Sequence, residues 1–88
     1  MPKIELTDRF SQLYNELPEA VRKKVNKAIR LLAEDIWHPS LQSKPIQGAP
    51  GIYEARVDRN YRITYERLAG DILLLRVVAK HDDALKNP

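Results

Sequence analysis

Three arginines in the second half of the chain, Arg56, Arg62 and Arg76, each stand in a segment that alternates apolar and polar residues. Side chains alternate between the two faces of a β-strand, so these segments predict strands with apolar residues facing inward and arginines facing outward. A guanidinium group presents planar N–H donors that match a phosphate. If the three arginines lie side by side, they form a phosphate-binding surface on the outer face of a sheet.

The pairing of the strands decides whether the arginines meet. A three-residue loop over 58–60, in which the asparagine can take a positive φ, places Arg56 opposite Arg62. A second turn over 68–70 places Arg76 beside Arg62. The same register predicts the pairs Tyr53–Tyr65, Ala55–Ile63, Tyr65–Leu73, Ile63–Leu75 and Tyr61–Val77, and it closes the second turn on Arg67–Asp71.

Like charges that face each other destabilise a sheet by about 0.2–1 kcal/mol, so a row of arginines needs compensation. A bound phosphate is one source of negative charge. The alternative is a lattice of exposed ion pairs, in which carboxylates of the same sheet neutralise the arginines. The carboxylates available for such a lattice are Glu54, Asp58 and Glu66.

The elements around the arginines follow from the spacing of the apolar residues. Alternation predicts strands, and apolar residues at i, i+3, i+4 and i+7 predict two amphipathic helices, the first capped by Thr7 and the second begun by Pro18. The predicted order is strand 3–6, helix 7–17, helix 18–36, a long loop over 37–51, and strands 52–57, 61–68 and 72–80. This order predicts an α+β fold, in which an N-terminal strand and a two-helix hairpin precede a three-stranded antiparallel meander. The helices would cover one face of the resulting four-stranded sheet.

Length and composition restrict the classes of function. The length of 88 residues predicts one domain over 1–88. The composition, with 43% hydrophobic and 31% charged residues, is typical of globular domains. The absence of cysteine excludes disulfides and thiolate zinc sites and fits a reducing compartment. No apolar run suits a membrane span or a signal peptide, so we expect a cytoplasmic protein. The net charge of +3 is compatible with an anionic partner.

A basic stripe runs along the second predicted helix on the face opposite its apolar residues. It consists of Lys23, Lys27 and Arg30, which are about one turn apart. Most such stripes are solvated faces, and contact with RNA is the alternative reading.

Prolines and glycines interrupt the segment 37–51 and predict a loop. Three apolar residues of this loop, Trp37, Leu41 and Ile46, are expected to hold it against the core. His38, between a tryptophan and a proline, is expected to be an ordinary loop residue, and none of these positions is assigned chemistry.

Together these segments resemble one family. The second helix LPEAVRKKVNKAIRLLAED, the loop motif L-x-x-K-P-I-x-G, the hairpin IYEARVDRNYRITYE and the closing strand LLLRVVAKHDD are similar to those of RelE/ParE superfamily toxins. The most specific piece is Y-x-x-R-V followed by YRI-x-Y. The resemblance extends over nearly the whole chain and implies the same α+β, RelE/ParE-like fold.

The resemblance implies a toxin of a type II toxin–antitoxin system. A RelE-like toxin of this kind is an mRNA interferase, an endoribonuclease that cleaves mRNA on the ribosome without a metal or other cofactor and so inhibits translation. In such enzymes the RNA 2′-hydroxyl attacks the adjacent phosphorus, a reaction that needs a base, an acid and cations. The implied partners are a cognate antitoxin protein and mRNA on the ribosome.

Four positions match catalytic positions of the family. Arg62 falls on the arginine of the YR pair and Arg56 on a basic residue of the preceding strand, both as stabilisers of negative charge. His81 falls on the basic or histidine position after the last strand and is a candidate acid or base, provided that the chain leaves the sheet after the last lysine of that strand. Glu54 stands where some relatives carry lysine and is a candidate base. The expected RNA-binding residues are Arg76, Lys80, Lys23, Lys27, Arg30 and Lys44.

Two other functions fit the same resemblance. A ParE-like noncatalytic toxin would bind DNA gyrase through the three arginines, and an inactive interaction module would keep the fold alone. The chain lacks the paired-lysine strand and the C-terminal tyrosine of some ribosome-dependent members, which leaves these alternatives open. Metal catalysis from His81, Asp82 and Asp83 is not expected, because adjacent side chains point in divergent directions.

Overall fold

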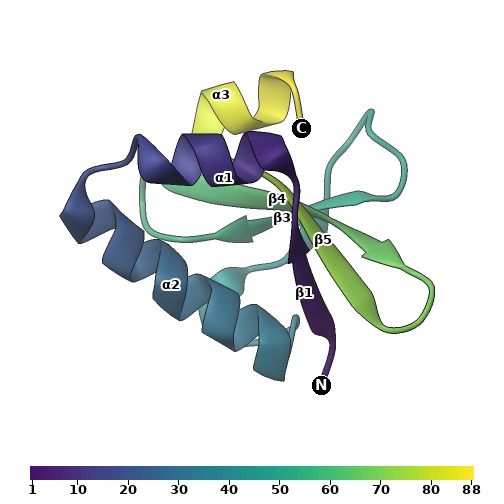
Figure 1. Cartoon of the computed structure of the whole chain (residues 1–88). Helices are drawn as coiled ribbons and strands as arrows, with labels where there is room; N and C mark the ends of the chain where they lie inside the picture. Colours follow the sequence, from purple (N-terminus) through teal and green to yellow (C-terminus); the bar gives the residue numbers. More distant parts are fainter.

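The computed structural model describes residues 1–88 and contains five strands and three α-helices (Figure 1). In chain order the elements are β1 (Lys3–Leu6), α1 (Asp8–Asn15), α2 (Glu19–Glu34), the short 3-10 helix η1 (Pro39–Leu41), β2 (Lys44–Pro45), β3 (Ile52–Arg56), β4 (Tyr61–Leu68), β5 (Ile72–Lys80) and α3 (His81–Lys86). The predicted strands and helices are present in their segments, which confirms the α+β class. β2 lies inside the segment predicted as a loop, and α3 was not predicted.

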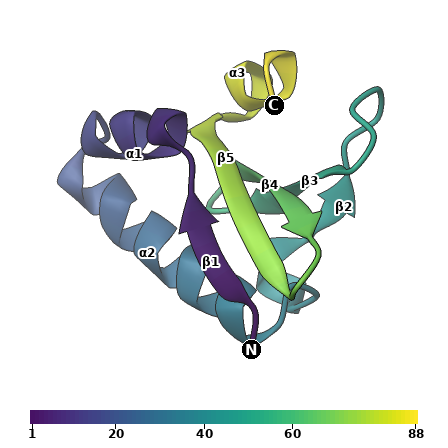
Figure 2. The ribbon, with the colours of Figure 1, turned by 45° about the vertical axis from the view of Figure 1, so that its right-hand side comes forward.

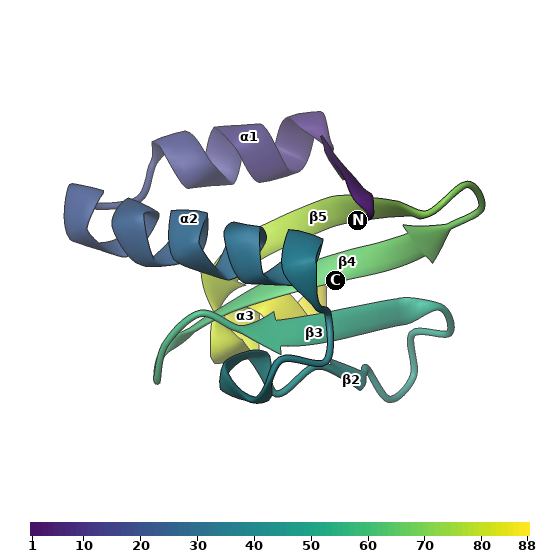
Figure 3. The same cartoon turned by 90° about the horizontal axis from the view of Figure 1, so that it is seen from below.

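The strands form one mixed sheet in the order β1-β5-β4-β3-β2. β1 runs parallel to β5 at one edge, β2 lies at the other edge (Figure 2), and all other neighbours are antiparallel. α1 and α2 cover one face of the sheet, and α3 lies on the opposite face (Figure 3), so we call these the hairpin-helix face and the α3 face. The sheet thus has five strands instead of the four predicted, and both of its faces carry helices.

α1 is held by an N-cap threonine, as predicted. The Thr7 hydroxyl accepts a hydrogen bond from the backbone N–H of Phe10 at 3.0 Å. It also donates to the backbone carbonyl of Arg76 in β5 at 3.0 Å, so the cap joins α1 to the sheet. α2 begins directly after Pro18, with the acidic Glu19 in its first turn.

The core fills the space between the two N-terminal helices and the sheet. The apolar stripes predicted for both helices face this space. The buried cluster comprises Phe10, Val25, Ala28 and Leu32 from the helices, Leu41 from η1, and Ala55, Ile63, Tyr65, Leu73, Leu75 and Val78 from the sheet.

None of the helices is both long enough and apolar enough to cross a membrane.

Two of the three apolar loop residues are buried as expected, namely Leu41 and Ile46. Trp37 is instead 55% exposed, and its ring stands edge-on to Tyr53 with the ring centroids 6.4 Å apart. Trp37 therefore packs on the margin of the sheet and outside the core. His38 has the expected structural role, because its Nδ1 accepts a backbone N–H at the start of η1 at 3.1 Å.

The β3–β4 hairpin has the predicted register, with Arg56 opposite Arg62. Its turn is built differently from the prediction, because Asn60 does not take a positive φ. The Asp58 side chain instead accepts two backbone N–H groups of the turn. The pairing that brings two arginines together was therefore predictable, whereas the way the turn is closed was not.

The predicted register of β4 with β5 is wrong. Leu68 pairs with Ile72, because Gly70 and Asp71 both take positive φ, 82° and 59°, and lengthen the turn. Further along, β5 contains one residue more than β4, and this bulge leaves Arg76 without a partner in the ladder.

The bulge reverses the alternation of β5, since an extra residue moves every following side chain to the other face. Val77, predicted for the core, pairs with Thr64 and is buried on the α3 face. Val78 takes its place in the core beneath the helices. Arg62 consequently lies opposite Ala79 and not beside the third arginine.

We expect the Thr7→Ala variant to lose about 1 kcal/mol of unfolding free energy, because α1 loses its cap and its side-chain link to β5. Urea unfolding followed by circular dichroism measures this loss. The matched control is Gln12→Ala on the exposed side of α1. Its unfolding free energy should stay within about 0.5 kcal/mol of wild type, and equal values for both variants would contradict the capping role.

Candidate nucleic-acid interface

Two arginine side chains converge at the end of the β3–β4 hairpin. Arg56 donates from Nε to the backbone carbonyl of Asp58 at 3.3 Å. Arg62 donates from Nη1 to the same carbonyl at 2.7 Å and to the carbonyls of Tyr61 and Arg59 at 2.9 and 3.4 Å. The two guanidinium groups thus share one acceptor, although they belong to different strands.

These contacts leave much of each guanidinium group available. Nε and Nη2 of Arg62 and both terminal nitrogens of Arg56 make no hydrogen bond within the chain. All three acceptors are neutral backbone carbonyls, and neither guanidinium group forms an ion pair with a carboxylate. Two adjacent, uncompensated guanidinium groups at a partly buried position favour the binding of an anion.

Asp58 organises this end of the hairpin. Its Oδ1 accepts the backbone N–H groups of Asn60 and Tyr61, both at 2.8 Å, and its Oδ2 pairs with the Lys24 ammonium of α2 at 3.3 Å. Burial tends to raise the pKa of the Asp58 carboxyl, but the two backbone hydrogen bonds and Lys24 together hold that pKa below its ordinary value of 3.8. The carboxylate of the folded hairpin is therefore ionised at neutral pH.

His81 lies beside the same turn. The chain leaves the sheet after Lys80, as expected, and the backbone N–H of His81 donates to the carbonyl of Asn60 at 2.8 Å. The ring is half-exposed, with Nδ1 3.2 Å from Oδ1 of Asp82. A depression of about 490 Å³ contains His81 together with Lys80 and Arg59. We call Arg56, Arg62, His81 and the turn 58–60 the hairpin site.

Arg76 does not belong to the hairpin site. Its Nη1 pairs with Oε1 of Glu66 at 3.1 Å, and its Nε donates to the carbonyl of Pro88 at 3.1 Å. The bulge places it opposite no residue of β4, which separates it from Arg62 along the strand. The predicted row of three arginines is therefore wrong, and two arginines remain. The predicted ion-pair lattice holds for Arg76 alone.

Glu54 is buried, with 6% of its surface exposed, and lies on the same sheet face as the two arginines by strand alternation. Its carboxylate is 4.0 Å from the ammonium group of Lys44 in β2 and makes no hydrogen bond to either arginine. A depression between β2 and α3 exposes the remaining surface of Glu54, beside Leu85. The structure thus pairs Glu54 with a lysine and separates it from the hairpin site.

The other basic residues with a predicted role in RNA binding fall into three groups. Lys80 belongs to the depression at the hairpin site, and Lys27 lines a cleft next to Arg56. Lys23 and Arg30 are exposed on α2 without an ion pair, and Lys44 is engaged with Glu54. No group of three or more histidine or acidic side chains is arranged to hold a metal ion.

Two residues of this region form contacts that the sequence analysis does not predict. Lys24 pairs with Asp58 from a helix 34 residues earlier, a contact that no local pattern contains. Asp58 is predicted as a turn residue and a neutralising charge, but its hydrogen bonds are not predicted, although an aspartate at the start of a polar turn commonly binds the backbone two residues ahead. That turn chemistry was the available signal.

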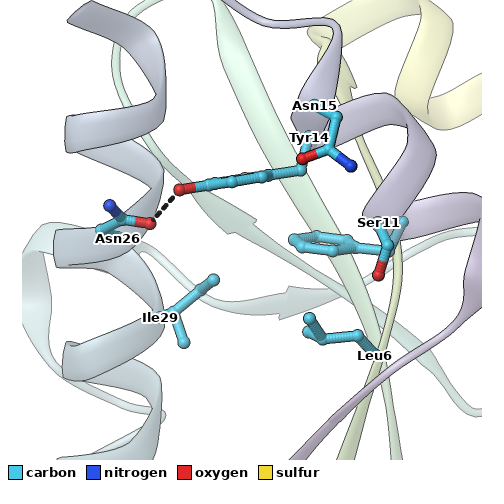
Figure 4. A pocket seen from close by; sticks show the side chains of 7 residues that line it. Leu6, Ser11, Tyr14, Asn15, Asn26 and Ile29 are labelled. Atoms are coloured by element: carbon cyan, nitrogen blue, oxygen red, sulfur yellow. Dashed lines mark hydrogen bonds between the residues drawn. The ribbon is translucent and has the colours of Figure 1, made fainter. Parts of the chain in front are cut away.

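A groove between α1 and α2, unlike the depressions around the hairpin site, is lined only by uncharged residues (Figure 4). It has a volume of about 400 Å³, and the Tyr14 hydroxyl donates to Oδ1 of Asn26 across it at 2.6 Å. No charged side chain lines this groove, so it offers nothing to bind a phosphate. Its lining consists of Leu6, Phe10, Ser11, Tyr14, Asn15, Asn26 and Ile29.

The depressed pKa of Asp58 predicts a pH-dependent contribution to stability. Because the folded state binds this proton less readily than the unfolded state, the contribution is present above the unfolded value of 3.8 and disappears as the pH falls through the folded pKa. The difference in unfolding free energy between wild type and Asp58→Asn should therefore shrink on acidification, as measured by urea unfolding at several pH values.

The control for this experiment is Glu34→Gln, which removes an exposed carboxylate at the end of α2 that forms no ion pair. We expect its difference from wild type to vary little between neutral and acidic pH. A difference for Asp58→Asn that does not change with pH would contradict the proposed stabilisation of the carboxylate.

Comparison with known proteins identifies solved structures that have the same fold. No protein-family model matches the chain, and no curated protein sequence is similar to it. Three solved structures resemble it closely in shape. YafQ from E. coli superposes with a TM-score of 0.76 at 17% identity, covering 94% of this chain and 97% of YafQ. The YoeB/ParE toxin from Agrobacterium tumefaciens gives 0.76 at 19% identity and covers 90% of this chain and 98% of the toxin.

The third structure is a chain of the RelB–RelE antitoxin–toxin complex from Methanococcus jannaschii. It gives a TM-score of 0.73 at 23% identity and covers 96% of this chain and 99% of that chain. All three superpositions span nearly the full length of both partners, so they include the sheet, the two N-terminal helices and the hairpin. The chain therefore has the fold of the RelE/ParE toxin superfamily.

Proposed function

We propose that this protein is the toxin of a type II toxin–antitoxin system and that it acts as an endoribonuclease on mRNA at the ribosome, without a metal or other cofactor. The observation that carries the proposal is the convergence of Arg56 and Arg62 on one carbonyl, with His81 at the same turn. The shared fold with RelE, YafQ and YoeB/ParE structures supports the class of protein. The site of action would be the cytoplasm, where mRNA is translated.

The proposed reaction is an intramolecular transfer at phosphorus. The RNA 2′-hydroxyl loses its proton to a base and attacks the adjacent phosphorus, and the bond from phosphorus to the 5′-oxygen breaks. The products are a 2′,3′-cyclic phosphate and a 5′-hydroxyl, which receives a proton from an acid. The unused N–H donors of Arg56 and Arg62 suit the extra negative charge that the phosphorane carries in the transition state.

His81 is the proposed proton donor to the 5′-oxygen. An imidazolium ring can donate a proton, and the half-exposed ring of His81 is accessible to a substrate at the hairpin turn. Glu54 remains a candidate for the base that accepts the 2′-hydroxyl proton, because it shares the sheet face of the two arginines. Its burial and its contact with Lys44 mean that a substrate would have to approach through the depression beside α3.

The proposed protein partner is a cognate antitoxin. Structures with the same fold have been solved as complexes of toxin and antitoxin, including RelB–RelE and DinJ–YafQ. The net charge of +3 of this chain fits an acidic partner as well as RNA.

We expect induced expression of the wild-type chain to arrest growth and to create new 5′-hydroxyl ends within mRNA. Arg62→Ala should abolish both effects while keeping the far-ultraviolet circular dichroism spectrum, since the residue lies at the end of a hairpin and outside the core. Mapping of mRNA 5′ ends measures the cleavage. Arg22→Ala, on α2 and outside the hairpin site, is the control that should arrest growth like wild type.

Cleavage that persists in Arg62→Ala would contradict the assigned role of this residue. Growth arrest without new mRNA ends would contradict the ribonuclease proposal. In that case, inhibition of gyrase supercoiling by the purified chain would identify a ParE-like activity. Absence of growth arrest and of cleavage would indicate an inactive interaction module.

We expect His81→Ala to lower the rate of RNA cleavage by about 10²–10⁴-fold, the usual contribution of a general acid. Affinity for the antitoxin, measured by calorimetry, should not change, because the variant keeps the backbone N–H that contacts the turn. An unchanged rate of cleavage would remove His81 from the mechanism.

A further inference from the structure

A cleft of about 260 Å³ separates α2 from the β3–β4 hairpin, directly next to the hairpin site. It is lined by both apolar and polar residues, and the polar ones come from three separate elements. We call it the α2 cleft. Its polar residues are Lys24 and Lys27 of α2, Ser40 of η1, and Arg56 and Asp58 of the hairpin.

The charges around the α2 cleft are unbalanced, with three cations and one carboxylate. Asp58 pairs with Lys24 at 3.3 Å, whereas Lys27 forms no ion pair. Arg56 contacts Asp58 only through a neutral carbonyl, and both of its terminal nitrogens are unused. A concave site with apolar walls and surplus positive charge concentrates anions more strongly than an exposed row of lysines.

We infer that the α2 cleft binds a phosphate of the RNA backbone, as a subsite that adjoins the hairpin site where cleavage is proposed and shares Arg56 and Asp58 with it. The choice of RNA as the ligand rests on the proposed function. The observation that favours it is Arg56, which lines the cleft and also shares the Asp58 carbonyl with Arg62. Arg56 thus connects the hairpin site with the α2 cleft, which also contains the unpaired Lys27.

Asp58 has a defined part in this subsite. Its carboxylate holds Lys24 when the cleft is empty and repels a phosphate that enters. Replacing it with asparagine keeps an acceptor oxygen for the two backbone N–H groups of the turn and removes only the negative charge. Asp58→Asn should therefore bind RNA more tightly than wild type, a direction that simple damage to the turn would not produce.

The test measures binding of a fluorescein-labelled 2′-O-methyl RNA decamer by fluorescence anisotropy over a series of KCl concentrations. This probe lacks the 2′-hydroxyl nucleophile, so binding is separated from cleavage. For a single strand, each lost phosphate contact lowers the slope of log affinity against log salt by about 0.7. We expect this decrease for Lys27→Gln and for Lys24→Gln.

The matched control is Lys3→Gln, which removes the same charge from β1, far along the chain from the α2 cleft. Its salt slope should equal that of wild type. Lys24 and Lys27 are exposed, and circular dichroism verifies that their variants are folded.

Three results would overturn the subsite. The first is that Lys27→Gln and Lys24→Gln bind the decamer with the same salt slope as Lys3→Gln. The second is that the wild-type chain does not bind the decamer. The third is that the wild-type chain binds an acidic peptide such as octa-aspartate, that Lys27→Gln does not, and that the decamer does not compete with the peptide. This result would assign the cleft to a protein partner. Because the decamer cannot be cleaved, a decreased slope supports the subsite even if expression arrests no growth. An unchanged slope with intact growth arrest rejects the subsite and leaves the proposed toxin activity standing.

Discussion

The hydrogen bonds of Asp58 are the constraint on which the charged end of this molecule depends. One residue uses its carboxylate to close the turn and to hold α2, and uses its carbonyl to receive two arginines. Without that shared carbonyl, Arg56 and Arg62 would repel each other across the strands and extend into solvent. Hydrogen bonds to one carbonyl thus keep two like charges adjacent, and the remaining donors of both guanidinium groups form no hydrogen bond to the Asp58 side chain.

The β3–β4 hairpin was predictable because its pairing satisfies two requirements at once. A three-residue turn and a single apolar face leave one register, in which Arg56 meets Arg62. The register of β5 was not predictable in this way, because Asp71 takes a left-handed conformation that the sequence permits without requiring it. The bulge at Arg76 then adds a second displacement, and its cost is offset by burial of Val77 on the α3 face.

The sequence predicted which residues form the candidate site better than it predicted how they are arranged. Arg56, Arg62 and His81 were all identified from the sequence, and their proximity to one turn depends on the hairpin and on the end of β5. Arg76 was misassigned because strand alternation alone cannot reveal an extra residue. Glu54 was identified as polar and functional, but its contact with Lys44 depends on β2, a two-residue strand within a segment rich in proline and glycine.

The parallel pairing of β1 with β5 joins the first strand of the chain to the last. During synthesis, β1 and the two helices after it leave the ribosome long before their partner strand has been made. Contacts so distant in sequence form late in folding, because the loop between them must close first. A nascent chain therefore cannot complete the sheet, or bring His81 to the hairpin turn, until translation of β5 has finished.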